Sequence, residues 1–162
     1  MAISKAKKGE VIEKLQKALK GAKSLVFVNF HGLKVSDATE MRRALKSEGV
    51  SYTVAKKSLT TRALEGEKFT GTLPSLDGEL ALAWGDDLVA PARGVHVFQK
   101  KFPEALKILG GIFEGKYMSK FEMEEIALIP SLDVLRGKFV NIINSPIQRF
   151  VIGLSEIAKI KN

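Results

Sequence analysis

The sequence predicts an α+β fold in which a four-stranded sheet packs against helices and an extended helical tail follows. Four short runs of strand-forming apolar residues alternate with segments of helical periodicity, as in an alternating β/α sandwich, of which a ferredoxin-like sheet is one form. After Pro130 the pattern changes to one long apolar stretch with helical periodicity. We therefore expect a globular domain over residues 1–129 and a helical tail over residues 130–162.

The first elements are a helix and a buried strand. Residues 8–22 place apolar side chains at the spacing of an amphipathic helix. Residues 25–28 are four consecutive strand-forming apolar residues, too few for a helix, and predict a strand that is buried on both faces. A turn at residues 29–32 is expected to end this strand.

The second helix is expected to begin at Ser36 or Asp37, because Asp37 and Glu40 have the spacing of a capping box. Gly49 stands just after its end, where glycine is favoured. The apolar side chains of this helix share one face. A different face carries three cations that can point outward together: Arg42, Arg43 and Lys46.

The rest of the globular domain alternates in the same way. Residues 50–54 predict a second strand, and a third helix over residues 56–64 carries Lys57 and Arg62 on one face. Ser119 and Glu122 have the spacing of a second capping box. The remaining elements are expected at residues 65–78 (surface loop), 79–84 (strand), 88–101 (helix), 106–113 (strand) and 119–128 (helix).

The tail contains an internal repeat with an offset of eleven residues. The two copies are Lys138-Phe139-Val140 followed by Ile143, and Arg149-Phe150-Val151 followed by Leu154. Eleven residues make almost three helical turns, so both copies present the same face. A kink or break is expected between them at Pro146. The tail could fold back on the core or lie on a membrane surface, but two tandem modules favour two copies of a partner that add helices.

Composition excludes several functional classes. The chain has no cysteine, and its two histidines have no metal-ligand spacing, so we expect no metal and no cofactor. No apolar run approaches the roughly 18 residues of a membrane-spanning helix. Residues 110–116 resemble a phosphate-binding loop, but Tyr117 follows where a Ser or Thr hydroxyl is needed. With no catalytic constellation either, we expect a cytoplasmic protein that is not an enzyme and does not bind a membrane.

The net charge of +8 is concentrated in the N-terminal part of the chain. Residues 1–62 hold fourteen Lys and Arg against five acids, a net of +9, whereas residues 63–162 hold twelve against thirteen, a net of −1. A basic surface gains affinity for nucleic acid by releasing counterions from phosphates. The partner of the N-terminal part is therefore expected to be polyanionic.

These motifs carry a resemblance to a known family. Residues 30–64 are similar to bacterial large-subunit ribosomal protein ten, the base of the ribosomal stalk, and the similarity extends through Gly110-Gly111 and Gly115-Lys116 into the tail. The motifs that carry it are FHGL at 30–33, MRRAL at 41–45, GVSY at 49–52, VAKKSL at 54–59 and RAL at 62–64.

The resemblance implies a ribosome-associated chain whose globular domain binds large-subunit ribosomal RNA beside ribosomal protein eleven. His31 stands where the family usually has Arg or Lys, Lys57 where Asn is usual, and Thr61 where a basic residue is frequent. Together with the two basic helix faces, the resemblance gives these expected RNA contacts: Gly32, Arg42, Arg43, Lys46, Lys56, Lys57 and Arg62.

For the tail, the resemblance implies binding of dimers of the acidic stalk protein seven/twelve, which recruit translation-factor GTPases. Two modules predict two dimers. The expected contacts are Leu135, Phe139, Val140, Ile143, Ile147, Phe150, Val151, Leu154 and Ile157. Two alternatives are an assembly factor that occupies the same RNA site and a free-standing RNA-binding regulator. Neither needs a tail that binds stalk dimers.

Overall fold

The computed structural model describes residues 5–66 and 69–161. The chain divides into two compact units, residues 1–129 and 130–162. The first contains a five-stranded sheet in the order β2-β3-β1-β4-β5, in which every neighbouring pair is antiparallel. Its strands are β1 (Ser24–Phe30), β2 (Ser51–Val54), β3 (Leu80–Gly85), β4 (Leu106–Phe113) and β5 (Lys116–Met118).

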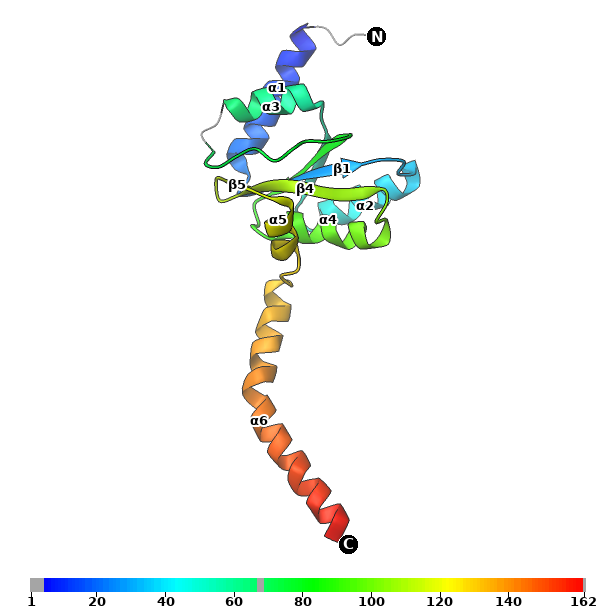
Figure 1. The fold of residues 1–162 in the computed structure, drawn as a ribbon, viewed down its shortest axis with the longest axis vertical. Helices are drawn as coiled ribbons and strands as arrows, with labels where there is room; N and C mark the ends of the chain where they lie inside the picture. Colours follow the sequence, from blue (N-terminus) through cyan, green and yellow to red (C-terminus); the bar gives the residue numbers. More distant parts are fainter. Residues whose placement is uncertain (1–4, 67–68, 162) are drawn as a thin grey trace. The chain divides into compact units, whose positions relative to one another are not determined.

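The four longer strands have the order of a ferredoxin-like sheet, with α2 connecting β1 to β2 and α4 connecting β3 to β4. Helices cover both faces of the sheet (Figure 1). Helices α1 and α3 lie on one face, and α2, α4 and α5 lie on the other. Their bounds are α1 (Lys5–Gly21), α2 (Val35–Ser47), α3 (Lys57–Glu65), α4 (Ala90–Lys101) and α5 (Lys120–Ala127).

Strand β1 lies at the centre of this arrangement, and its side chains enter both cores. Val26 and Val28 pack with α2, α4 and α5, whereas Leu25 and Phe27 pack with α1 and α3. This follows from the alternation of side chains along a strand. All four are buried, which confirms the prediction of a strand covered on both faces.

Several boundaries differ from the sequence-based expectations. β1 continues through Asn29 and Phe30, which were expected in the turn. The capping box at Asp37 and Glu40 is wrong: α2 begins at Val35, so Asp37 lies inside its first turn, and no side chain caps the helix. The Ser36 hydroxyl donates a hydrogen bond to the Asp37 carboxylate at 3.1 Å, and neither side chain caps the helix.

The short strand β5 was not predicted. Glu114 and Gly115 have left-handed φ angles of 48° and 78°, as in the two-residue turns that join tight hairpins. This turn reverses the chain between β4 and β5, so the sequence that resembles a phosphate-binding loop is a β-hairpin. A phosphate-binding loop would instead lead from a strand into a helix.

The second unit is α6 (Leu132–Lys161), a helix of 30 residues. A kink or a break was expected at Pro146; the helix continues through it, so there is no break, and Figure 1 shows α6 bending without interruption. A proline removes one backbone donor from the hydrogen-bond ladder of a helix. The turns on either side keep their own hydrogen bonds, and bending relieves the clash of the ring.

Gly111 in β4 leaves no room for a side chain between β1 and α5. A Cβ atom there would lie 2.6 Å from Cε of Met123 and closer still to the backbone oxygen of Leu25. We expect Gly111→Ala to lower the free energy of unfolding by about 1–3 kcal/mol, because the well-packed core must shift to accept a methyl group. Urea unfolding would measure this. In the matched control Gly9→Ala, on α1, the new methyl group meets no atom within 4 Å, and unchanged or higher stability is expected. Equal effects would contradict the packing explanation.

The capping box predicted at the start of α5 is confirmed, and it makes stability depend on pH. The Ser119 hydroxyl accepts a hydrogen bond from the Glu122 backbone N–H at 3.4 Å, and the Glu122 carboxylate accepts one from the Ser119 N–H at 2.8 Å. Hydrogen bonds from the Ser119 backbone and hydroxyl hold the pKa of Glu122 below its ordinary value of 4.5. The carboxylate therefore stabilises the fold above pH 4.5, and this contribution is lost as the pH falls through the folded-state pKa.

We expect Ser119→Ala to lower the free energy of unfolding by about 1 kcal/mol at pH 7, the usual effect of losing an N-cap side chain. The difference from wild type should decrease in acid, as Glu122 becomes protonated in both proteins. Thermal unfolding between pH 7 and pH 3 would measure this. Ser36→Ala is the matched control, because the Ser36 hydroxyl caps no helix. A pH-independent difference would exclude the contribution of Glu122.

Candidate functional site

The first group of predicted contacts lies on α2. Arg42, Arg43 and Lys46 are all exposed. The Arg42 guanidinium lies 5.7 Å from the ring centroid of Tyr52 in edge strand β2, which directs it toward the edge of the sheet. Burial raises the pKa of Tyr52 to about 12, and the Arg42 charge acts in the opposite direction. The basic face of α2 therefore borders β2.

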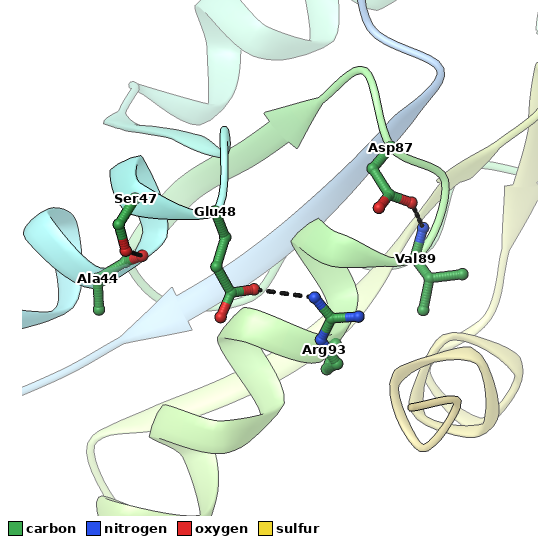
Figure 2. Close-up of polar contacts among 6 residues, drawn as sticks. All are labelled: Ala44, Ser47, Glu48, Asp87, Val89 and Arg93. Atoms are coloured by element: carbon green, nitrogen blue, oxygen red, sulfur yellow. Dashed lines mark hydrogen bonds and ion pairs between the residues drawn. The ribbon is translucent and has the colours of Figure 1, made fainter. Parts of the chain in front are cut away.

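Two acidic side chains point the other way, toward α4: Glu40 on α2 and Glu48 at its C-cap. Glu48 accepts a hydrogen bond from Arg93 at 3.1 Å, as Figure 2 shows, and Glu40 lies 3.5 Å from Nζ of Lys101. Hydrogen bonds within residues 44–47 and 87–89 fix the two helix ends beside the Glu48–Arg93 pair (Figure 2). Two α4 cations thus pair with these carboxylates, whereas within residues 5–66 and 69–161 the cations on the β2 side form no ion pair.

The second group of predicted contacts lies on the opposite helix layer. Lys56 immediately precedes α3, and Lys57 and Arg62 lie on it, with Lys56 and Arg62 exposed and Lys57 half-buried. The structure therefore does not bring all seven predicted residues to one face. The α2 and α3 groups lie on opposite faces of the sheet, with edge strand β2 between their layers.

One edge of the sheet nevertheless connects the two groups. β1 and β2 are both antiparallel to β3, so they point in the same direction and end at the same edge of the sheet. This edge is formed by the ends of the strands and is distinct from the side of the sheet formed by edge strand β2. Gly32, with a left-handed φ of 66°, follows β1 there, and Lys56 follows β2. The His31 backbone N–H donates to the Ala105 carbonyl at 2.9 Å, which holds the turn while its side chain is exposed.

Both α2 and α3 begin at this edge with a lysine in the N-cap position. Lys34 precedes α2 and Lys56 precedes α3, each with an extended backbone and no side-chain cap. The N–H groups of a first helical turn lack intrahelical partners and attract anions, and a lysine beside them adds to that attraction. Sequence reasoning missed Lys34 because it placed the start of the helix at Ser36 or Asp37.

In the part of the chain that the structure describes, these cations are not paired with carboxylates. Within residues 5–66 and 69–161, none of the predicted basic contacts forms an ion pair. Over the same residues, no group of three or more His, Asp or Glu side chains could hold a metal ion. No helix in these ranges is long and apolar enough to cross a membrane. Open positive charge at a sheet edge is therefore the main chemical feature of this unit.

The nine predicted contacts on α6 are all exposed, with exposed fractions between 40% and 68%. At 3.6 residues per turn they occupy an arc of roughly 160° along the helix. We call these nine residues the apolar stripe. Sequence reasoning missed three exposed residues within or beside this arc, although the same helical spacing identifies them: Leu132, Ile142 and Ile160.

Comparison with known proteins gives consistent matches. The family model described as ribosomal protein L10 matches residues 3–100. Proteins named large ribosomal subunit protein uL10 from Bacillus cereus strains B4264 and AH187 and from Bacillus anthracis strain CDC 684 are each 35% identical to this chain over 152 residues. Each alignment covers 93% of this chain and 91% of the relative.

Proposed function

The chain belongs to the ribosomal protein L10 family, and we propose that it anchors the ribosomal stalk by binding large-subunit ribosomal RNA with residues 1–129 and dimers of the acidic stalk protein seven/twelve with α6. Membership itself makes the chain a structural protein of the large ribosomal subunit. The observation that carries the RNA half of the proposal is the cluster of cations around the edge where β1 and β2 end, which form no ion pairs within residues 5–66 and 69–161.

RNA binding at this edge follows from the chemistry of its residues. Arg42 and Arg43 can each bridge two phosphate oxygens, and Lys46 adds a point charge on the same helix. The Gly32 turn exposes backbone without a side chain, so phosphates can approach closely. Because the α2 and α3 cations lie on opposite sheet faces, we propose that the RNA runs along edge strand β2. There it contacts the helix layers on both faces of the sheet. These groups recognise the shape and backbone of folded RNA.

The exposed apolar stripe carries the second half of the proposal. Such a surface is covered when helices of a partner pack against it. Among the described residues of α6, five cations outnumber two acids, which favours an acidic partner: Arg136, Lys138, Arg149, Lys159 and Lys161 against Asp133 and Glu156. We propose one stalk dimer for each eleven-residue module.

In this arrangement the two units act at different places in the same assembly. The globular unit binds the RNA beside ribosomal protein eleven, and the stalk dimers on α6 recruit translation-factor GTPases. The chain thus affects those GTPases indirectly. An assembly factor or a free-standing regulator could use the same RNA contacts, but neither explains the exposed apolar stripe.

We expect Arg42→Glu combined with Lys56→Glu to weaken RNA binding and to reduce the slope of log affinity against log salt by about two, because each lost phosphate contact removes about one. Filter binding to a large-subunit ribosomal RNA fragment would give the slope. The KCl concentration would range from about 50 to about 300 mM, where counterion release is measurable. The matched control reverses the charge of two exposed lysines at the opposite end of β1, with Lys23→Glu and Lys116→Glu. An unchanged slope in the first variant would exclude the site.

The two-module arrangement predicts four stalk-protein chains bound to each copy of the full-length chain, as counted by native mass spectrometry. A chain that ends at Ser145 keeps only the first module, so we expect two. Phe150→Asp with Val151→Asp should also give two, because charge on the second module opposes apolar packing. Val134→Asp with Ile152→Asp is the control, because these exposed residues lie on the other side of α6. This variant should still bind four stalk-protein chains. Any other stoichiometry contradicts one dimer per module.

A further inference from the structure

The edge where β1 and β2 end contains an open recess of about 520 Å³. Phe30, Val54 and Leu80 form apolar parts of its lining, and the polar residues Lys56, Lys57 and Glu79 also line it. We propose that this recess holds one unstacked base of the bound RNA, an inference that rests on the proposed RNA binding. Neither the family match nor the predicted contacts assign Phe30, Val54 or Glu79 a binding role.

The recess is formed by strand ends that are already fixed. The Phe30 N–H donates to the Glu79 carbonyl at 3.2 Å, and the Ala55 N–H donates to the Leu80 carbonyl at 3.2 Å, so β1, β2 and β3 are joined around it. The loop before β3 is also held, because the side-chain amide of Asn29 donates a hydrogen bond to the Asp77 backbone carbonyl at 2.8 Å. A ligand therefore meets a preformed surface, which lowers the entropic cost of binding.

Apolar surface in the recess is accessible to a ligand. Val54 is 47% exposed, although it lies in a strand, and Phe30 is only partly buried. Single-stranded bases bind proteins by stacking on aromatic side chains, while nearby cations contact the phosphates on either side. Phe30 and Val54 supply the apolar contact, and Lys56 and Lys57 supply the cations. A free phosphate would leave the apolar lining uncovered.

The charges favour a nucleotide over an acidic peptide. Glu79 would repel a peptide carboxylate that enters between the lysines. A base is neutral, and the Glu79 carboxylate can accept a hydrogen bond from an exocyclic amino group. Adenine, cytosine and guanine carry such a group and uracil does not. The recess should therefore prefer an amino-bearing base to uracil.

The inference is tested with the full-length chain and the large-subunit ribosomal RNA fragment that it protects from ribonuclease. 2-Aminopurine replaces each unpaired base of that fragment in turn, and its fluorescence reports changes in stacking. One position should change on binding wild type. Phe30→Leu, which keeps an apolar side chain but removes the ring, should abolish that change and weaken affinity about tenfold with the salt slope unaltered. Phe30→Tyr, which keeps the ring, should restore both.

Glu79→Gln is a second variant that does not depend on core packing, because Glu79 is exposed. The amide can donate as well as accept, so the variant should lose the preference for an amino-bearing base over uracil at the identified position. An unchanged preference would overturn the role of Glu79.

The outcomes separate this inference from the proposed function. If wild type binds the fragment with a steep salt slope but Phe30→Leu binds equally well, the recess holds no base while the RNA-binding proposal stands. If Phe30→Leu loses affinity only when ribosomal protein eleven is present, the recess is a protein contact and the inference fails. If wild type does not bind the fragment at all, the RNA-binding proposal itself fails.

Discussion

The pairing of β3 between β1 and β2 is the constraint on which the binding surface depends. Because β3 is antiparallel to both neighbours, β1 and β2 must end at the same edge of the sheet. The chain leaves that edge twice, once into α2 and once into α3, and the two helices pack on opposite faces. Residues that are distant in the sequence, such as Gly32 and Lys56, therefore lie at the same edge. The recess lies at the same edge because its lining is made from the ends of these strands.

The same topology controls how charge is distributed. A helix that packs on a sheet beside another helix has a shared flank and an outer flank. α2 and its C-cap place Glu40 and Glu48 on the flank shared with α4, where Lys101 and Arg93 pair with them. Exposed pairs of this kind contribute little to stability. They matter more for the proposed RNA binding, because carboxylates directed toward α4 do not screen Arg42 and Lys46 from a polyanion.

Sequence reasoning recovered what local periodicity determines. The continuous run at residues 25–28 identified the buried central strand, and Ser119 with Glu122 identified a true capping box. It could not recover the separation of the cations into two layers, because strand order depends on pairing between distant segments. The cap at Asp37 failed because Ser36 and Asp37 bond to each other and the helix begins earlier. β5 was missed because three residues are too few to show a period.

The exposed stripe of α6 sets a different requirement from that of the globular unit. Burying apolar surface is worth about 25 cal/mol per Å², so a helix with this many uncovered large side chains gains far more from a partner than from its own hydrogen bonds. The repeat of eleven residues rotates the second module by only about 20° relative to the first, because eleven residues are close to three full turns. A continuous helix through Pro146 preserves that alignment, whereas a break would turn the second module away. An uninterrupted α6 is thus the geometry that two identical partners require if each is to find the same surface.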